Sequence, residues 1–209
     1  GIPDDNKENG ISLNYESDKI HVKGVIVLDY SFNYSHWNAV KSLDQWLKEN
    51  KIPGIYGVDT REVTKYLRDN GTQLGAIIPR GFNTPTKKLT YNSIDKKIDS
   101  FTRLVDDLQD IYICILRNYE VIKYGKEGSK RVILVDCGVK NSILRKLVNK
   151  DIELIRVPWD YDFNTLEYDG VIVSNGPGNP DFCAETIKNI QVAMEKKKPV
   201  FGICMGNQL

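Results

Sequence analysis

A cysteine near the end of the sequence lies in a pattern that suits nucleophilic chemistry. Cys204 follows the short apolar run Val200-Phe201 and stands midway between Gly202 and Gly206. This spacing is typical of a sharp turn from a strand into a helix, which lifts the central side chain clear of the sheet. The N-terminus of the following helix lowers the pKa of a thiol placed there. The pattern predicts a nucleophilic elbow, with a buried structural cysteine as the alternative interpretation.

A thiolate that attacks a carbonyl group needs donors for the negative oxygen that forms. The backbone N–H of Met205, one residue after the cysteine, is the natural first donor. A second candidate is the loop Ser-Asn-Gly-Pro-Gly-Asn-Pro at 174–180, which is rigid at its prolines and permissive at Gly176 and Gly178. Such a loop suits backbone N–H groups that face an anion. The alternative is a tight glycine turn without a chemical role.

The elements around these two loops alternate between strand and helix. From residue 131 onward, β-branched runs predict strands at 132–135, 152–157, 170–173 and 200–201, and apolar periodicity predicts helices at 143–148 and about 184–196. Continuous apolar runs are typical of strands buried on both faces of a parallel sheet. We therefore expect a doubly wound, mostly parallel sheet, with both loops at the carboxyl ends of its strands, where sites form.

The first part of the chain predicts a smaller α+β unit. Ser42 is a suitable N-cap for a helix with apolar residues at 43, 46 and 47, and Asp59 or Thr60 for a helix at 61–68 that ends at Asn70-Gly71. For Asp59 and Arg61, a cap and an interdomain or intersubunit ion pair is favoured over a catalytic pair. We predict three ranges: 1–100 for this unit, 101–130 for a linker, and 131–209 for the doubly wound domain.

Composition narrows the class of protein. The 209 residues carry a net charge of +1 and are 41% hydrophobic, which is ordinary for a globular protein and gives no electrostatic reason to expect nucleic acid as a partner. No apolar stretch approaches the roughly 20 residues of a membrane span, so we expect a cytoplasmic protein without a membrane partner. The four cysteines are widely spaced, which argues against a zinc site or a disulfide framework.

The elbow also carries a family resemblance. Phe-Gly-Ile-Cys-Met-Gly-Asn-Gln-Leu at 201–209 resembles the nucleophile motif of class I (triad) glutamine amidotransferases. The resemblance implies that Cys204 is the catalytic nucleophile. It further implies that Gly176 and Met205 supply the oxyanion donors, and that the residues contacting substrate glutamine are Gly176, Gly178, Met205 and Gln208.

A second block selects one family among the amidotransferases. Ile-Pro-Gly-Ile-Tyr-Gly-Val-Asp-Thr-Arg at 52–61, with Gly-Ala-Ile-Ile at 75–78, resembles the N-terminal domain of the small subunit of glutamine-dependent carbamoyl-phosphate synthetase. The sequence departs from the usual motifs of the family at three positions. Asn179 stands where aspartate is commoner, Asn207 where histidine is common, and Ser142 where asparagine is usual. We expect Ser142 to cap the helix that follows it, as asparagine does.

The resemblance implies a glutaminase that supplies ammonia for the synthesis of carbamoyl phosphate from bicarbonate and ATP, a reaction of pyrimidine or arginine biosynthesis. It implies no cofactor or metal in this segment. ATP and Mg²⁺ are expected in a synthetase large subunit or fused synthetase domain, which would be the partner.

The resemblance also implies catalytic residues that this sequence does not contain. In the family, the histidine and glutamate that complete the triad lie about a hundred residues beyond the elbow, and neither His21 nor His36 matches them. We therefore expect a piece of a longer protein, truncated at both ends. Two alternatives stay open: a non-catalytic relative that docks on a synthetase, and a different cysteine-dependent hydrolase with an elbow.

Overall fold

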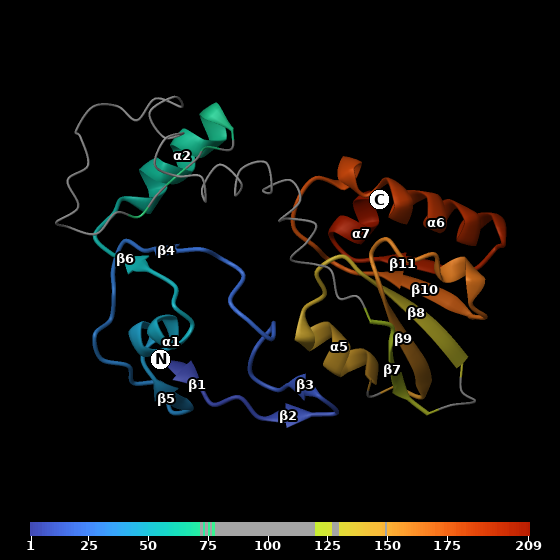
Figure 1. Ribbon diagram of the computed structural model, residues 1–209, viewed down its shortest axis with the longest axis horizontal. Helices are drawn as coiled ribbons and strands as arrows, with labels where there is room; N and C mark the ends of the chain where they lie inside the picture. Colours follow the sequence, from blue (N-terminus) through green and yellow to red (C-terminus); the bar gives the residue numbers. More distant parts are fainter. Residues whose placement is uncertain (72, 74, 76, 78–119, 127–129, 149) are drawn as a thin grey trace. The chain divides into compact units, whose positions relative to one another are not determined.

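The computed structural model describes residues 1–71, 73, 75, 77, 120–126, 130–148 and 150–209, and the chain divides into two compact units (Figure 1). Unit 1 comprises Gly1–Asp5 and Lys19–Asp106, and unit 2 comprises Asn6–Asp18 and Asp107–Leu209. Cys114 and most of the predicted linker at 101–130 lie outside the described residues. The three predicted domain ranges therefore stay predictions.

Unit 2 is built on one five-stranded sheet with the order β11-β10-β8-β9-β7. Its strands are β7 (Ile122–Gly125), β8 (Lys130–Asp136), β9 (Ile152–Pro158), β10 (Gly170–Val173) and β11 (Val200–Gly202). Every neighbouring pair is parallel except β7 with β9, which is antiparallel. The predicted mostly parallel sheet is thus confirmed. Strand β7, which falls inside the predicted linker, was not anticipated from the sequence.

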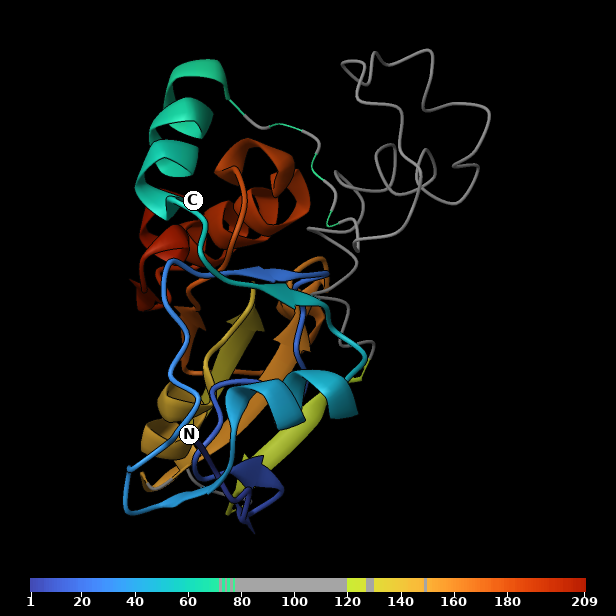
Figure 2. The same cartoon turned by 90° about the vertical axis from the view of Figure 1, so that its left-hand side faces the viewer.

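Helices cover both faces of this sheet, as expected for a doubly wound fold (Figures 1 and 2). Along β8, Ile133 and Val135 belong to one buried cluster with residues of α6 (Ala184–Glu195), whereas Leu134 belongs to another with Leu144 of α5 (Asn141–Val148). Successive side chains of a strand point to opposite faces, so the two clusters lie on the two sides of the sheet. The remaining elements of unit 2 are β2 (Lys7–Glu8), β3 (Ile11–Ser12), η1 (Phe163–Thr165), η2 (Pro180–Phe182) and α7 (Met205–Gln208).

Unit 1 contains less regular secondary structure than unit 2. It contains an antiparallel pair, β1 (Ile2–Pro3) with β5 (Ala39–Lys41), a parallel pair, β4 (Val25–Ile26) with β6 (Gly54–Ile55), and the helices α1 (Leu43–Glu49) and α2 (Thr60–Asn70). Both predicted caps are confirmed. Ser42 forms a capping box with Gln45, and the Asp59 carboxylate accepts hydrogen bonds from two backbone N–H groups at the start of α2. The ion pair predicted for Arg61 stays a prediction.

The helices of this structure are short relative to the thickness of a membrane. None of the helices among the described residues combines the length and apolar character needed to cross a bilayer. The longest helix described in unit 2 has 12 residues, whereas a span needs about 20.

The fold predicts that shortening one buried side chain of the sheet strongly lowers the stability of the protein. Leu134 is fully buried against α5, so Leu134→Ala should lower the free energy of unfolding by about 2 to 5 kcal/mol, because it removes apolar contacts and leaves a cavity. Met194→Ala is the matched control, since Met194 is 62% exposed and its change should stay within about 0.5 kcal/mol. Urea denaturation of both variants checks this. Equal midpoints would contradict the assigned packing.

Candidate active site

The elbow predicted at Cys204 is present. Cys204 lies between β11 and α7 with φ 54° and ψ −110°, one of four non-glycine residues with positive φ among those described. An L-residue held in this region costs about 1 to 3 kcal/mol and persists only where the surroundings fix it. The Cys204 residue is exposed. The backbone therefore presents a thiol to solvent at the carboxyl end of the edge strand β11.

The flanking glycines permit the close approach of strand and helix. A Cβ at Gly202 would overlap the carbonyl of Gly206, and a Cβ at Gly206 would overlap the carbonyl of Val173 in β10. Both obstacles are backbone atoms, which cannot rotate away as a side chain can. Alanine at either position would therefore push α7 off the sheet.

The loop after β10 meets the elbow, and hydrogen bonds join them. The Ile203 N–H donates to the Val173 carbonyl at 2.9 Å, and the Gly206 N–H to the Ser174 carbonyl at 3.2 Å. A Cβ at Gly176 would lie 3.0 Å from the sulfur of Met205. The Met205 side chain is thus packed beneath the glycine loop, and it is 3% exposed. The structure brings Cys204, Met205 and Gly176 into one place.

The two other predicted substrate residues have distinct positions. Gly178 has φ 99° and nothing within 4 Å of a Cβ built on it, so it lies on the open side of the loop. Gln208 is exposed on α7, one turn after the elbow. Contact of either residue with glutamine stays a prediction.

A third loop, which the sequence analysis did not include, completes the arrangement. The Cys137 N–H, just after β8, donates to the Ser174 hydroxyl at 2.9 Å, and the Cys137 carbonyl lies directly against Gly176. The Asn175 amide donates to the Gly138 carbonyl at 3.0 Å and accepts from the Lys140 N–H at 3.4 Å. The sequence feature that could have revealed this loop is Asp-Cys-Gly at 136–138. It stands at the end of a buried strand, at the same edge of the sheet as the glycine loop and the elbow.

A buried ion pair fixes the start of this third loop. Asp136 accepts from the Gly138 and Val139 N–H groups at 2.9 and 2.8 Å, and from the Arg156 guanidinium at 2.7 Å. Burial lowers the pKa of Arg156, but the adjoining Asp136 carboxylate outweighs burial and leaves that pKa above its usual value. A buried carboxylate with this many donors holds the loop in one conformation.

The described cysteines differ in their suitability as nucleophiles. Burial raises the pKa of Cys137 far above its ordinary value and also raises that of Cys183. Both thiols therefore stay protonated at neutral pH, and both are packed in the core. Since only the thiolate is a good nucleophile, Cys204 is the candidate among the cysteines that the structure describes.

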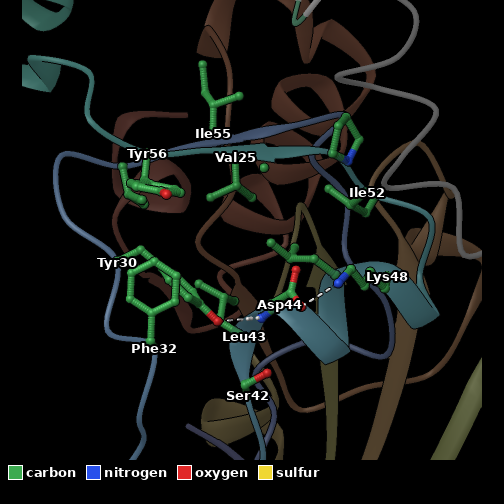
Figure 3. A pocket seen from close by; sticks show the side chains of 14 residues that line it. Val25, Tyr30, Phe32, Ser42, Leu43, Asp44, Lys48, Ile52, Ile55 and Tyr56 are labelled. Atoms are coloured by element: carbon green, nitrogen blue, oxygen red, sulfur yellow. Dashed lines mark hydrogen bonds and ion pairs between the residues drawn. The ribbon is translucent and has the colours of Figure 1, made fainter. Parts of the chain in front are cut away.

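Unit 1 contains a cavity of about 530 Å³, which is a second candidate site (Figure 3). The rings of Tyr30, Phe32 and Tyr56 lie at one side of it, and the Asp44–Lys48 ion pair, 2.7 Å long, lies at another. None of its 14 lining residues is a cysteine or histidine. The elbow therefore remains the better candidate for covalent chemistry.

Two family models match this chain. Residues 133–209 match "Glutamine amidotransferase class-I", and this range contains most of the sheet, the glycine loop and the elbow described above. Residues 7–77 match "Carbamoyl-phosphate synthase small chain, CPSase domain". The two matches cover the two regions in which the sequence showed its resemblances.

Curated relatives agree with both models. The chain is 42% identical over 99% of its length to human "Carbamoyl-phosphate synthase [ammonia], mitochondrial", 41% over 97% to "Multifunctional protein pyr1-3" of Dictyostelium discoideum, and 34% over 97% to "Carbamoyl phosphate synthase small chain" of Pyrococcus furiosus. It spans 13%, 9% and 53% of these proteins, respectively. The chain belongs to the carbamoyl-phosphate synthase small-chain family.

The elbow predicts that Gly206 accepts no side chain. Gly206→Ala should lower the free energy of unfolding by about 1 to 3 kcal/mol, because the new Cβ overlaps a backbone carbonyl of β10. The neighbouring Asn207 is exposed, so Asn207→Ala should change it by less than about 0.5 kcal/mol. Thermal denaturation monitored by circular dichroism compares them. A Gly206→Ala variant as stable as the parent would refute the close contact.

Proposed function

We propose that this chain is the nucleophile-bearing part of the glutaminase component of a carbamoyl-phosphate synthase. The proposal rests on one observation. Cys204 is exposed on an elbow with positive φ, and hydrogen bonds join this elbow to a glycine loop whose Gly176 adjoins Met205. Membership of the small-chain family supports it, because the two family models occur together in one chain.

In the proposed reaction, the Cys204 sulfur attacks the side-chain carbonyl carbon of glutamine. The carbonyl oxygen becomes an oxyanion, which the backbone N–H groups of Gly176 and Met205 stabilise, and Gly178 and Gln208 hold the substrate. Loss of one such donor typically slows acylation about 10²- to 10³-fold. The amide nitrogen takes up a proton and leaves as ammonia. Water then cleaves the thioester, and glutamate and the free thiol are released.

A histidine oriented by a carboxylate would move the protons in both half-reactions. In the family that this sequence resembles, that pair lies downstream of the elbow. Neither histidine of this chain is proposed for the role, since His21 and His36 match no triad position and both belong to unit 1.

The product ammonia would pass to a synthetase large subunit or fused synthetase domain, which would be the partner and would bind ATP and Mg²⁺. No cofactor or metal is proposed for this segment. Human and Dictyostelium relatives many times longer than this chain are compatible with a fused partner, whereas the Pyrococcus small chain is compatible with a separate one. A cytoplasmic location is proposed, although the human relative is named as mitochondrial. Carbamoyl phosphate would serve pyrimidine or arginine synthesis.

A second candidate is a non-catalytic amidotransferase-like domain that docks on the synthetase. It is favoured by the human relative, 42% identical, whose name gives ammonia as its nitrogen source. The presence of Cys204 on the exposed elbow favours the glutaminase. The two candidates differ in whether glutamine is hydrolysed at all.

Replacement of the nucleophile separates them. In the complete natural protein with its synthetase, Cys204→Ser should abolish glutamine-dependent formation of carbamoyl phosphate, because serine has no thiolate, and should leave ammonia-dependent formation unchanged. Cys183→Ser, at a buried cysteine of the same unit, is the control for a general effect of losing a thiol. If Cys204→Ser still releases glutamate from glutamine, the assignment of Cys204 as the nucleophile is wrong. If the parent protein releases no glutamate, the non-catalytic candidate is favoured.

A further inference from the structure

The segment Asn6–Asp18 folds with unit 2, although the residues on both sides of it belong to unit 1. Its strands β2 and β3 form a short antiparallel hairpin. Ile11 is 4% exposed and shares a buried cluster with Leu134 and Leu144 of the amidotransferase sheet and helix α5. A segment that the small-chain family model includes from residue 7 is thus physically part of the amidotransferase unit.

Residues of this segment cap helix α5. The Asn141 N–H donates to the Glu16 carbonyl at 3.1 Å, and the Ser142 N–H donates to the Glu16 carboxylate at 3.0 Å. The Asn141 side chain also donates to the Tyr15 carbonyl at 3.0 Å. The first N–H groups of a helix lack partners within the helix and must find them elsewhere. The prediction that Ser142 is the cap was wrong, because Ser142 lies inside the helix and Glu16 supplies the cap across the fold.

Arg145 fastens the same segment to the next turn of α5. Its guanidinium contacts the Glu16 carboxylate at 3.2 Å and donates to the carbonyls of Ser12 and Tyr15 at 2.5 and 3.5 Å. Partial burial raises the pKa of Glu16, but hydrogen bonds from Ser142 and Arg145 outweigh it and leave that pKa below its usual value. Glu16 is therefore ionised at neutral pH, and its charge also suits the positive end of the helix.

The capped end of α5 is adjacent to the glycine loop. The Lys140 carbonyl accepts the Ile143 N–H at 3.0 Å, while the Lys140 N–H donates to the Asn175 side chain at 3.4 Å. The Asn175 amide binds Gly138 at 3.0 Å on the same turn. Asn175 directly precedes Gly176. The Glu16 cap is therefore connected to the proposed oxyanion donor through the residues at the start of α5 and the Asn175 side chain.

We propose that Glu16 is a positioning residue of the amidotransferase site. By capping α5, it fixes residues 138–140, which hold Asn175 and thereby set the orientation of the Gly176 N–H. This inference rests on the proposed glutaminase function only for its kinetic consequence. The structural consequence, order in the glycine loop, does not depend on that function.

The kinetic test uses Glu16→Ala in the complete natural protein. Misplaced oxyanion donors weaken binding of the transition state more than binding of glutamine, so kcat for glutamine hydrolysis should fall roughly 10- to 100-fold while KM changes less than about 3-fold. Glu16→Gln should recover most of the lost kcat, because its amide oxygen can still accept from Ser142. Ammonia-dependent synthesis should be unchanged in both variants.

The matched control is Asp18→Ala. Asp18 is a carboxylate on the same segment whose partner, Lys7, is 3.9 Å away, and both side chains are more than half exposed. This variant should keep the parental kcat. A Glu16→Ala protein with the parental kcat would overturn the proposal, and so would equal losses in Asp18→Ala and Glu16→Ala.

Hydrogen–deuterium exchange supplies a readout that needs no activity. In Glu16→Ala, amides at 137–142, 174–176 and 178 should exchange at least about 10-fold faster, while those of β9 keep the parental rate. Faster exchange throughout unit 2 would show that Glu16 only stabilises the fold and would overturn the proposal, as would unchanged exchange in the glycine loop. If the parent protein proves unable to hydrolyse glutamine, the proposed function fails, and the exchange pattern alone decides the role of Glu16.

Discussion

The arrangement of the site depends on the hydrogen bonds of one buried residue, Ser174. Its N–H donates to Val135 of β8 at 3.1 Å, its carbonyl accepts from Gly206 of α7 at 3.2 Å, and its hydroxyl accepts from Cys137 at 2.9 Å. The hydroxyl donates in turn to the Asn175 carbonyl at 2.8 Å. Ser174 is fully buried. Each of these polar groups would therefore lower the stability of the fold by about 1 to 3 kcal/mol if it lost its hydrogen-bond partner. The ends of β8 and β10 and the start of α7 are therefore held in register by one side chain and its backbone.

This register explains how the chain maintains strain at Cys204. A positive φ at a non-glycine residue relaxes unless the chain on both sides is fixed. Before the cysteine, the Ile203 N–H is bound to β10, and after it, the Gly206 N–H is bound to Ser174. Gly202 and Gly206 are packed so closely against backbone atoms of α7 and β10 that a Cβ at either would overlap them. The exposed thiol is thus a consequence of the packing beneath it.

The sequence predicted the parts of this fold that depend on local patterns. The strand and helix alternation after residue 131, the elbow at Cys204 and the caps at Ser42 and Asp59 all follow from periodicity or from residue preferences within a few positions, and the structure confirms them. Strand β7 was missed because an antiparallel edge strand of 4 residues is too short to show a period. The third loop was missed because its role requires knowing that β8 lies next to β10. The substrate contacts of Gly178 and Gln208 remain predictions.

The cap of α5 shows why local pattern fails in a particular way. Ser142 has the side chain of a good N-cap and stands close to the predicted helix start, so a rule based on neighbouring residues selects it. The carboxylate that performs the capping comes from Glu16, 126 residues earlier in the chain. A helix needs its first N–H groups satisfied, but the donor geometry does not specify where the acceptor comes from. The amidotransferase unit is consequently discontinuous in sequence, and its boundary cannot be placed at the first strand of its sheet.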